Sequence, residues 1–199
     1  MYALTVKQPW AEAIARHGKT VENRSRRPPA HLLGQRIAIH VGQAADAWID
    51  AHAAGIRSLD LQDAHLRPLL DWAIDPRAGQ VPRRDHVPNA GRIIATARLA
   101  GWVASDGSAA WAPGILGINA RESPWFTGPV GWVLADVRVL QQPVGAGGSC
   151  GAERGIRGGH NVCERCGRLL LEHQPIRGQP YPFKLSAEVE TAILAQEET

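Results

Sequence analysis

The 199-residue sequence has no apolar run that approaches the roughly 18 residues of a membrane-spanning helix. Its N-terminus has no basic stretch followed by an apolar one, which is the pattern of a secretory signal. The sequence also has no internal repeat. We therefore expect a single domain over residues 1–199, with no membrane segment, located in the cytoplasm.

Cysteine is scarce, and the number of cysteines, three, is odd. In a chain without a secretory signal this disfavours disulfides. Cys163 and Cys166 have the spacing that lets two sulfurs bind one tetrahedral zinc, and Cys150 and His160 can supply the other two ligands. His173 is the alternative to His160. Four protein ligands indicate a structural zinc rather than a catalytic one, whereas the competing interpretation is free cysteines in an unligated loop.

Charge of one sign is not in great excess, since the formal net charge is +3. This permits a polyanionic partner without demanding one. Tyrosine and phenylalanine are few, with two of each, against seven tryptophans, whose indole rings suit the stacking of a base. Four cations also fall within nine residues, and the alternative for them is a solubilising surface: Lys19, Arg24, Arg26 and Arg27.

The segment Leu4–Arg24 places an aromatic and several charged side chains around one short helix. Proline at position 9 and glycine at position 18 predict a helix of about two turns over Pro9–His17, with Trp10 in its first turn. The residues that follow alternate as a strand, with Lys19, Val21 and Asn23 on one side and Thr20, Glu22 and Arg24 on the other. The alternative is an N-terminal helix and hairpin whose charges are solvated.

The rest of the chain is predicted as strands separated by long irregular connections. The expected strands are Tyr2–Val6, Arg36–Val41, Arg92–Val103 and Val130–Leu140. The expected helices are Gln43–Ala54, Ser58–Ala73 and Ala187–Gln196, the last with Ser186 as its N-cap. Asp75–Gly91 and Ala104–Gly117 are expected to be irregular.

Five segments follow one another in a family pattern. They are LTVKQPWAEAIARHGKTVENRSRRP (Leu4–Pro28), GQRIAIHVG (Gly34–Gly42), GRIIATARLAGWV (Gly91–Val103), SPWFTGPVGWVLADVRVLQQPV (Ser123–Val144) and PFKLSAEVETAI (Pro182–Ile193). In this order they resemble the ASCH family, the ASC-1 homology domains of the PUA-like group, over most of the chain outside three loops. The resemblance implies an α+β fold, a PUA-like small mixed β-barrel of about five or six strands with helices around it. It also makes Gly145–Pro175 an insertion, a zinc-knuckle-like loop that needs metal or the barrel to become ordered.

The resemblance places a pocket at the mouth of the barrel. Trp10 and Trp132 lie near it, and Ser123–Phe126 looks like a short turn that lays an aromatic ring over the same opening. His40, at the end of a strand, is a candidate base, although a structural histidine is the alternative. The candidate ligand-binding residues are Trp10, Lys19, Glu22, Asn23, Arg24, Arg26, His40 and Trp132.

Two functions suit such a pocket. In the first, it binds single-stranded RNA or a modified nucleotide, with cations on phosphate, a tryptophan stacked on a base, and Glu22 and Asn23 on the polar edge of that base. In the second, it hydrolyses a modified nucleoside or RNA, with Lys19 and Glu22 as the catalytic acid–base pair. A domain that only binds other proteins is a third alternative.

The resemblance itself argues against one form of hydrolysis. Some ASCH proteins resemble small amidohydrolases that use a lysine, a threonine nucleophile and a glutamate, and others have been linked to RNA cleavage. Lys19 matches the lysine, but Glu22 stands where that pattern has its threonine, and Gly91–Val103 contains no glutamate. The covalent acyl mechanism therefore lacks its nucleophile.

Overall fold

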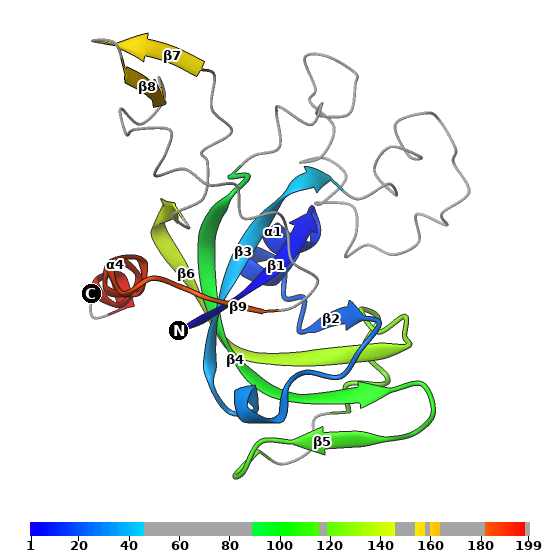
Figure 1. Ribbon diagram of the computed structural model, residues 1–199. Helices are drawn as coiled ribbons and strands as arrows, with labels where there is room; N and C mark the ends of the chain where they lie inside the picture. The colour runs from blue at the N-terminus through cyan, green and yellow to red at the C-terminus, as the bar shows by residue number, and fades with distance from the viewer. Residues whose placement is uncertain (46–88, 116–118, 146–153, 158–159, 164–181, 198–199) are drawn as a thin grey trace, which may run out of the picture.

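The computed structural model describes residues 1–45, 89–115, 119–145, 154–157, 160–163 and 182–197. These residues form an α+β protein, as predicted (Figure 1). One sheet contains seven strands: β1 (Tyr2–Gln8), β2 (Val21–Arg24), β3 (Arg36–Ala45), β4 (Arg92–Ala104), β5 (Ala109–Trp111), β6 (Val130–Gly145) and β9 (Phe183–Lys184). The helices are α1 (Trp10–Arg16), the short 3-10 helix η1 (Ala30–Leu32) and α4 (Ala187–Glu197). A separate pair is formed by β7 (Arg154–Arg157) and β8 (His160–Cys163).

The sheet has the strand order β2-β6-β4-β3-β1-β9, and β5 pairs with β4 outside this path. β1 runs parallel to β3, with Leu4 opposite Ile39, and the other pairs are antiparallel. No backbone pairing joins the two end strands, β2 and β9, in the described part of the chain. The sheet is therefore open there, and the closed barrel that the resemblance implied is not seen.

The four strands predicted from alternation are confirmed, and so is the final helix with Ser186 at its N-terminus, where the hydroxyl accepts from Val189 N at 3.4 Å. The helix predicted over Gln43–Ala54 is wrong for its first three residues. They belong to β3, because β1 continues to Gln8, which pairs with Ala45. The chain between residues 46 and 88, including the rest of that helix and the one at Ser58–Ala73, lies outside the described residues. The segment Ala104–Gly117, expected to be irregular, contains β5.

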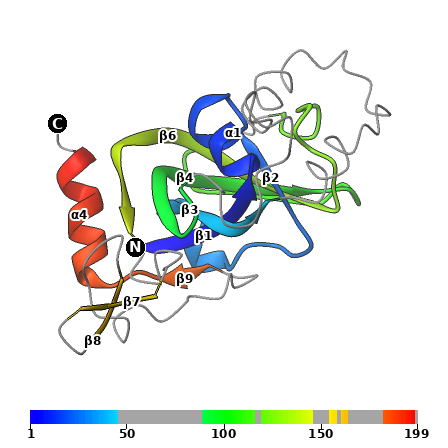
Figure 2. The same cartoon turned by 90° about the horizontal axis from the view of Figure 1, so that it is seen from above.

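Side-chain alternation divides the core between the two faces of the sheet. On one face Leu4 and Ile39 pack with Ile14 of α1. On the other face Ala3 and Ala38 pack with α4. The helices therefore lie on different sides of the sheet, as Figure 2 shows. Within the described residues no helix has the length and hydropathy needed to cross a membrane.

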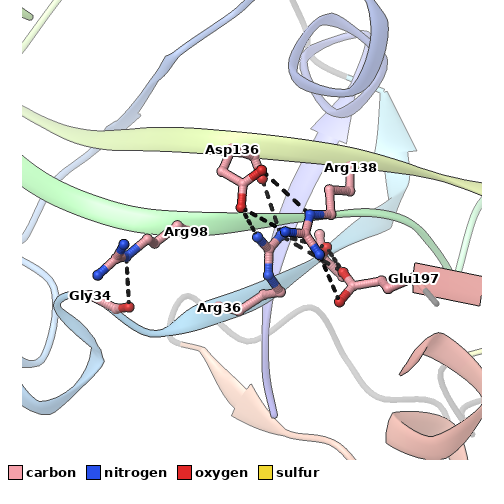
Figure 3. Close-up of polar contacts among 7 residues, drawn as sticks. Gly34, Arg36, Arg98, Asp136, Arg138 and Glu197 are labelled. Atoms are coloured by element: carbon pink, nitrogen blue, oxygen red, sulfur yellow. Dashed lines mark hydrogen bonds and ion pairs between the residues drawn. The ribbon is translucent and has the colours of Figure 1, made fainter. Parts of the chain in front are cut away.

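A bulge in β6 gathers charges on the face that carries α4. Asp136 adopts a left-handed backbone conformation, with φ of 46°. Its carboxylate accepts from Arg36 of β3, and it also accepts from Arg138 Nη2 at 3.2 Å (Figure 3). The carboxylate of Glu197, at the end of α4, accepts from the Thr96 hydroxyl and lies 3.7 Å from Arg36 Nη1. Glu197 thus fastens α4 to β3 and β4, and Asp136 joins β3 to the bulge of β6.

Candidate functional site

The candidate site begins where α1 ends. The backbone N–H groups of His17 and Lys19 both donate to the Ala13 carbonyl, at 3.0 and 3.1 Å, which closes the last turn of the helix. Gly18 between them has a φ of +68°, a conformation that a residue with a Cβ adopts only with strain. This turn sends the side chain of Lys19 back under the helix, where only 3% of its surface is exposed.

Lys19 Nζ lies between two indole rings. Its distances to the ring centroids of Trp10 and Trp125 are 5.7 and 5.6 Å. The ammonium also donates to the Val21 carbonyl and lies 3.5 Å from Glu22 Oε2. Trp125 comes from the Ser123–Phe126 segment, so this segment places an aromatic ring beside Lys19.

The prediction that Lys19 and Glu22 point to opposite sides of a strand is wrong. β2 begins only at Val21, so Lys19 belongs to the turn before it and does not take part in the alternation. The two side chains therefore meet.

Arg24 is the second cation of the cluster. Its Nε lies 3.5 Å from Glu22 Oε1, and its Nη2 donates to the Thr5 carbonyl of β1. The guanidinium carbon lies 6.0 Å from the ring centroid of Trp132. Arg24 Nε is buried without a hydrogen-bond partner, since its contact with Glu22 is an ion pair only. The carboxylate of Glu22 thus pairs with two cations, and the Nε–H group of Arg24 makes no hydrogen bond.

Burial lowers the pKa of the Lys19 amine below its ordinary value, and the nearby Arg24 adds to this effect. The charge and hydrogen bond of Glu22 oppose it. Burial also lowers the pKa of Arg24, although a guanidinium stays charged in proteins. Two buried cations around one carboxylate carry a desolvation penalty that a purely apolar core would avoid. Such a constellation is a candidate functional site.

Two predicted ligand-binding side chains have structural partners. Asn23 Nδ2 donates to the Trp125 carbonyl at 2.8 Å, and Asn23 Oδ1 accepts from Thr127 N at 3.0 Å. Asn23 therefore holds the loop that carries Trp125. Trp132 is 2% exposed, and its Nε1 donates to the Arg26 carbonyl at 2.8 Å. The ring of Trp132 therefore lies in the interior beside Arg24, whereas the side chain of Arg26 is exposed.

His40 lies in β3 and is almost fully buried. Its Nδ1 is 3.1 Å from the Thr5 hydroxyl, and its ring meets Phe183 edge to face with centroids 5.4 Å apart. Burial lowers its pKa to about 4, against an opposing hydrogen bond with the Gly91 backbone. These contacts favour the structural alternative for His40.

The zinc prediction falls largely outside the described residues. Cys150, Cys166 and His173 lie there, whereas His160 and Cys163 are the two ends of β8, opposite Arg157 and Arg154 of β7. Among the described residues no group of three or more His, Cys, Asp or Glu side chains could hold a metal ion. The zinc site stays a prediction.

Sequence reasoning did not identify Thr5, whose carbonyl receives Arg24, or the partnership between Arg27 and Trp102, whose ring centroid lies 4.4 Å from the guanidinium carbon. The alternation of side chains along one strand carries no information about a backbone acceptor on another strand.

The chain matches no model of a known protein family, and no curated protein matches it significantly in sequence.

Proposed function

We propose that the chain binds single-stranded RNA or a modified nucleotide at the cluster of Lys19, Glu22 and Arg24. The observation that carries this proposal is the ammonium of Lys19 held between Trp10 and Trp125 beside a carboxylate. Trp10 is only partly buried, and stacking on an aromatic ring is the usual way in which proteins hold an unpaired base.

Each group of the cluster suits one part of a nucleotide. The cations attract phosphate, and 18% of the Arg24 side chain is exposed and can meet one. The carboxylate of Glu22 is an acceptor for an amino or imino group on the edge of a base. Charged groups of both signs next to an aromatic ring therefore recognise a base and its phosphate together.

We also propose that the described sheet belongs to an ASCH-like, PUA-like barrel. What supports it is the contact between Arg24 of β2 and Thr5 of β1, which brings strands from opposite parts of the sheet order together. A curled sheet of this kind has the cluster at its seam.

Binding is tested by fluorescence anisotropy with a labelled octaribonucleotide over a range of salt concentrations. Arg24→Ala is expected to weaken binding and to lower the salt slope by about 0.7, the value for one phosphate contact on a single strand. The matched control is Arg98→Ala, which removes an exposed arginine of β4 that donates to the Gly34 carbonyl at 3.1 Å. Equal effects of the two changes, or no RNA binding by the unaltered protein, would contradict the proposal.

Hydrolysis of a modified nucleoside or RNA is the second candidate, and the 3.5 Å contact between Lys19 Nζ and Glu22 Oε2 favours it. A buried amine with a lowered pKa releases its proton to a bound substrate or water more readily than an exposed lysine does. In that case Lys19→Met and Glu22→Gln should each lower kcat strongly and change KM little. A panel of modified nucleosides and short RNAs without turnover would exclude hydrolysis of these substrates and leave binding in place.

A further inference from the structure

Three cations of the segment between α1 and η1 each lie near an indole ring. Lys19 contacts Trp10 and Trp125, Arg24 contacts Trp132, and Arg27 contacts Trp102. The last two tryptophans are directly opposite each other on the antiparallel strands β4 and β6. Side chains that face each other in this way are close neighbours on one face of a sheet. The row of cations therefore continues from the candidate site toward the end of β4.

Arg27 is the member of this row that is open to solvent. Its guanidinium carbon lies 4.4 Å from the ring centroid of Trp102, a stacking distance, whereas 56% of the side chain is exposed. The edge of the guanidinium is held as well, because Nη2 donates to Ser108 Oγ at 3.0 Å and lies 3.7 Å from Asp106 Oδ2. The guanidinium thus lies over an indole ring and is held at one nitrogen, while much of the side chain stays exposed.

The chain itself fastens this arrangement to the candidate site. Trp132 Nε1 donates to the carbonyl of Arg26, which directly precedes Arg27. Arg27 comes three positions after Arg24, which allows a distance of at most about 11 Å between their Cα atoms. Adjacent nucleotides of one strand can bridge this distance.

The charge balance indicates what Arg27 would bind. Asp106 lies beside it and offsets its charge, which weakens the attraction for a phosphate. A flat guanidinium surface still stacks on the face of a base, as arginine planes do in single-stranded RNA recognition. A nucleobase therefore fits this position better than a phosphate does.

We infer that Arg27, supported by Trp102, is a stacking platform for a second base of single-stranded RNA, next to the base held at the Lys19 cluster. The inference rests on the proposed function and extends it from one nucleotide to two neighbouring ones. It also assigns Arg27 a task that lysine cannot perform, because an ammonium has the same charge but no planar face.

The test pairs a change in the protein with a change in the RNA. The probe is a labelled octaribonucleotide of mixed sequence, together with a set in which one position at a time has no base. With the unaltered protein, loss of the base above Arg27 should weaken binding by about fivefold or more. Arg27→Lys should weaken binding of the complete RNA by a similar factor, and removing that same base should then have no further effect. The salt slope should stay unchanged, since the charge is kept.

Arg98→Lys is the control, because it makes the same change at an exposed arginine of β4, away from Trp102. Thermal unfolding of the Arg27→Lys protein checks that it is folded. If Arg27→Lys binds all the RNAs as the unaltered protein does while Arg24→Ala weakens binding, the platform is refuted and the proposed function stands. If the unaltered protein binds none of the RNAs, the proposed function fails, and the platform fails with it.

Discussion

The guanidinium of Arg24 donates a hydrogen bond to the carbonyl of Thr5, which joins β2 to β1 although β2 pairs with β6, and β1 with β3 and β9. Lys19 makes only a local contact, in which its ammonium donates to the carbonyl of Val21, two residues further along the chain. Glu22 lies 3.5 Å from each cation. Arg24 thus holds a seam between β1 and β2 with Glu22 as its counterion, and these two side chains form the candidate site together with Lys19.

Glu22→Gln should destabilise the protein strongly. Removing the carboxylate leaves two buried cations close together without their shared counterion, and breaking a buried ion pair in this way costs about 3 kcal/mol or more. Urea unfolding measures the loss. Glu122→Gln, at an exposed glutamate, is the control and should change the free energy of unfolding by less than about 0.5 kcal/mol. Similar values for the two variants would show that Glu22 does not hold the seam.

His40 should make the protein less stable in acid. The folded protein binds a proton on His40 only near pH 4, whereas the unfolded chain binds it near pH 6.5. Between these values the unfolded state holds more protons, so this contribution to the free energy of unfolding falls as pH drops, by about 3 kcal/mol in total. Urea unfolding at a series of pH values measures this loss.

Two variants separate His40 from other sources of this pH dependence. His40→Gln should flatten the change between pH 6.5 and pH 4, whereas His31→Gln, at an exposed histidine, should leave it as it is. An unchanged profile in His40→Gln would assign the pH dependence to other groups.

Gly131→Ala should disturb the strand that carries Glu22. A Cβ at Gly131 would lie 2.6 Å from Val21 Cγ1 and 2.8 Å from Phe126 Cδ2, so β2 or the Trp125 loop must shift. Overpacking of this kind costs about 1–3 kcal/mol. Gly145→Ala is the matched control on the same strand, because no heavy atom lies within 4 Å of its Cβ position. Thermal unfolding compares the midpoints of the two variants. Equal midpoints would mean that the residues around Gly131 accommodate the added Cβ without loss of stability.

Protein purified without chelator should contain about one zinc ion per chain, bound by Cys150, Cys163, Cys166 and either His160 or His173. Elemental analysis measures the zinc. Cys163→Ser should lose the zinc and still show the cooperative unfolding of the main sheet, because β7 and β8 pair only with each other among the described strands. His17→Ala, which changes a histidine outside the insertion, should keep it. Zinc-free protein from zinc-supplemented cells would refute the site.

The strands β1, β3, β4 and β6 could be predicted because each is long enough for its pattern to be read, whereas the three-residue β5 and the two-residue β9 are not. In β3, Ile37, Ile39 and Val41 are fully buried, as their alternation predicted. The pattern also grouped Trp10, Lys19, Glu22 and Arg24, and their side chains form a continuous series of contacts.

Two features of the site could not be predicted from local pattern. The contact between Lys19 and Glu22 depends on where β2 begins, because a residue that lies before the first strand residue does not follow the alternation of the strand. The acceptor of Arg24 is a backbone carbonyl nineteen positions away, which leaves no trace in side-chain pattern. Long-range backbone contacts of this kind require the assembled sheet.

The bulge at Asp136 changes which side chains of β6 face each side of the sheet. Between the pairs formed by Ala135 and Arg138, β6 has one residue more than β4. Before the bulge Trp132 and Leu134 face the core that contains α1, and after it the odd-numbered Val137 packs against that same core. Leu140 can then pack with α4. One extra residue thus moves the even-numbered side chains of β6 from the core that contains α1 to the core that contains α4. The number of residues between Leu134 and Leu140 is therefore fixed, because a deletion there would turn one of the two apolar sets away from its core.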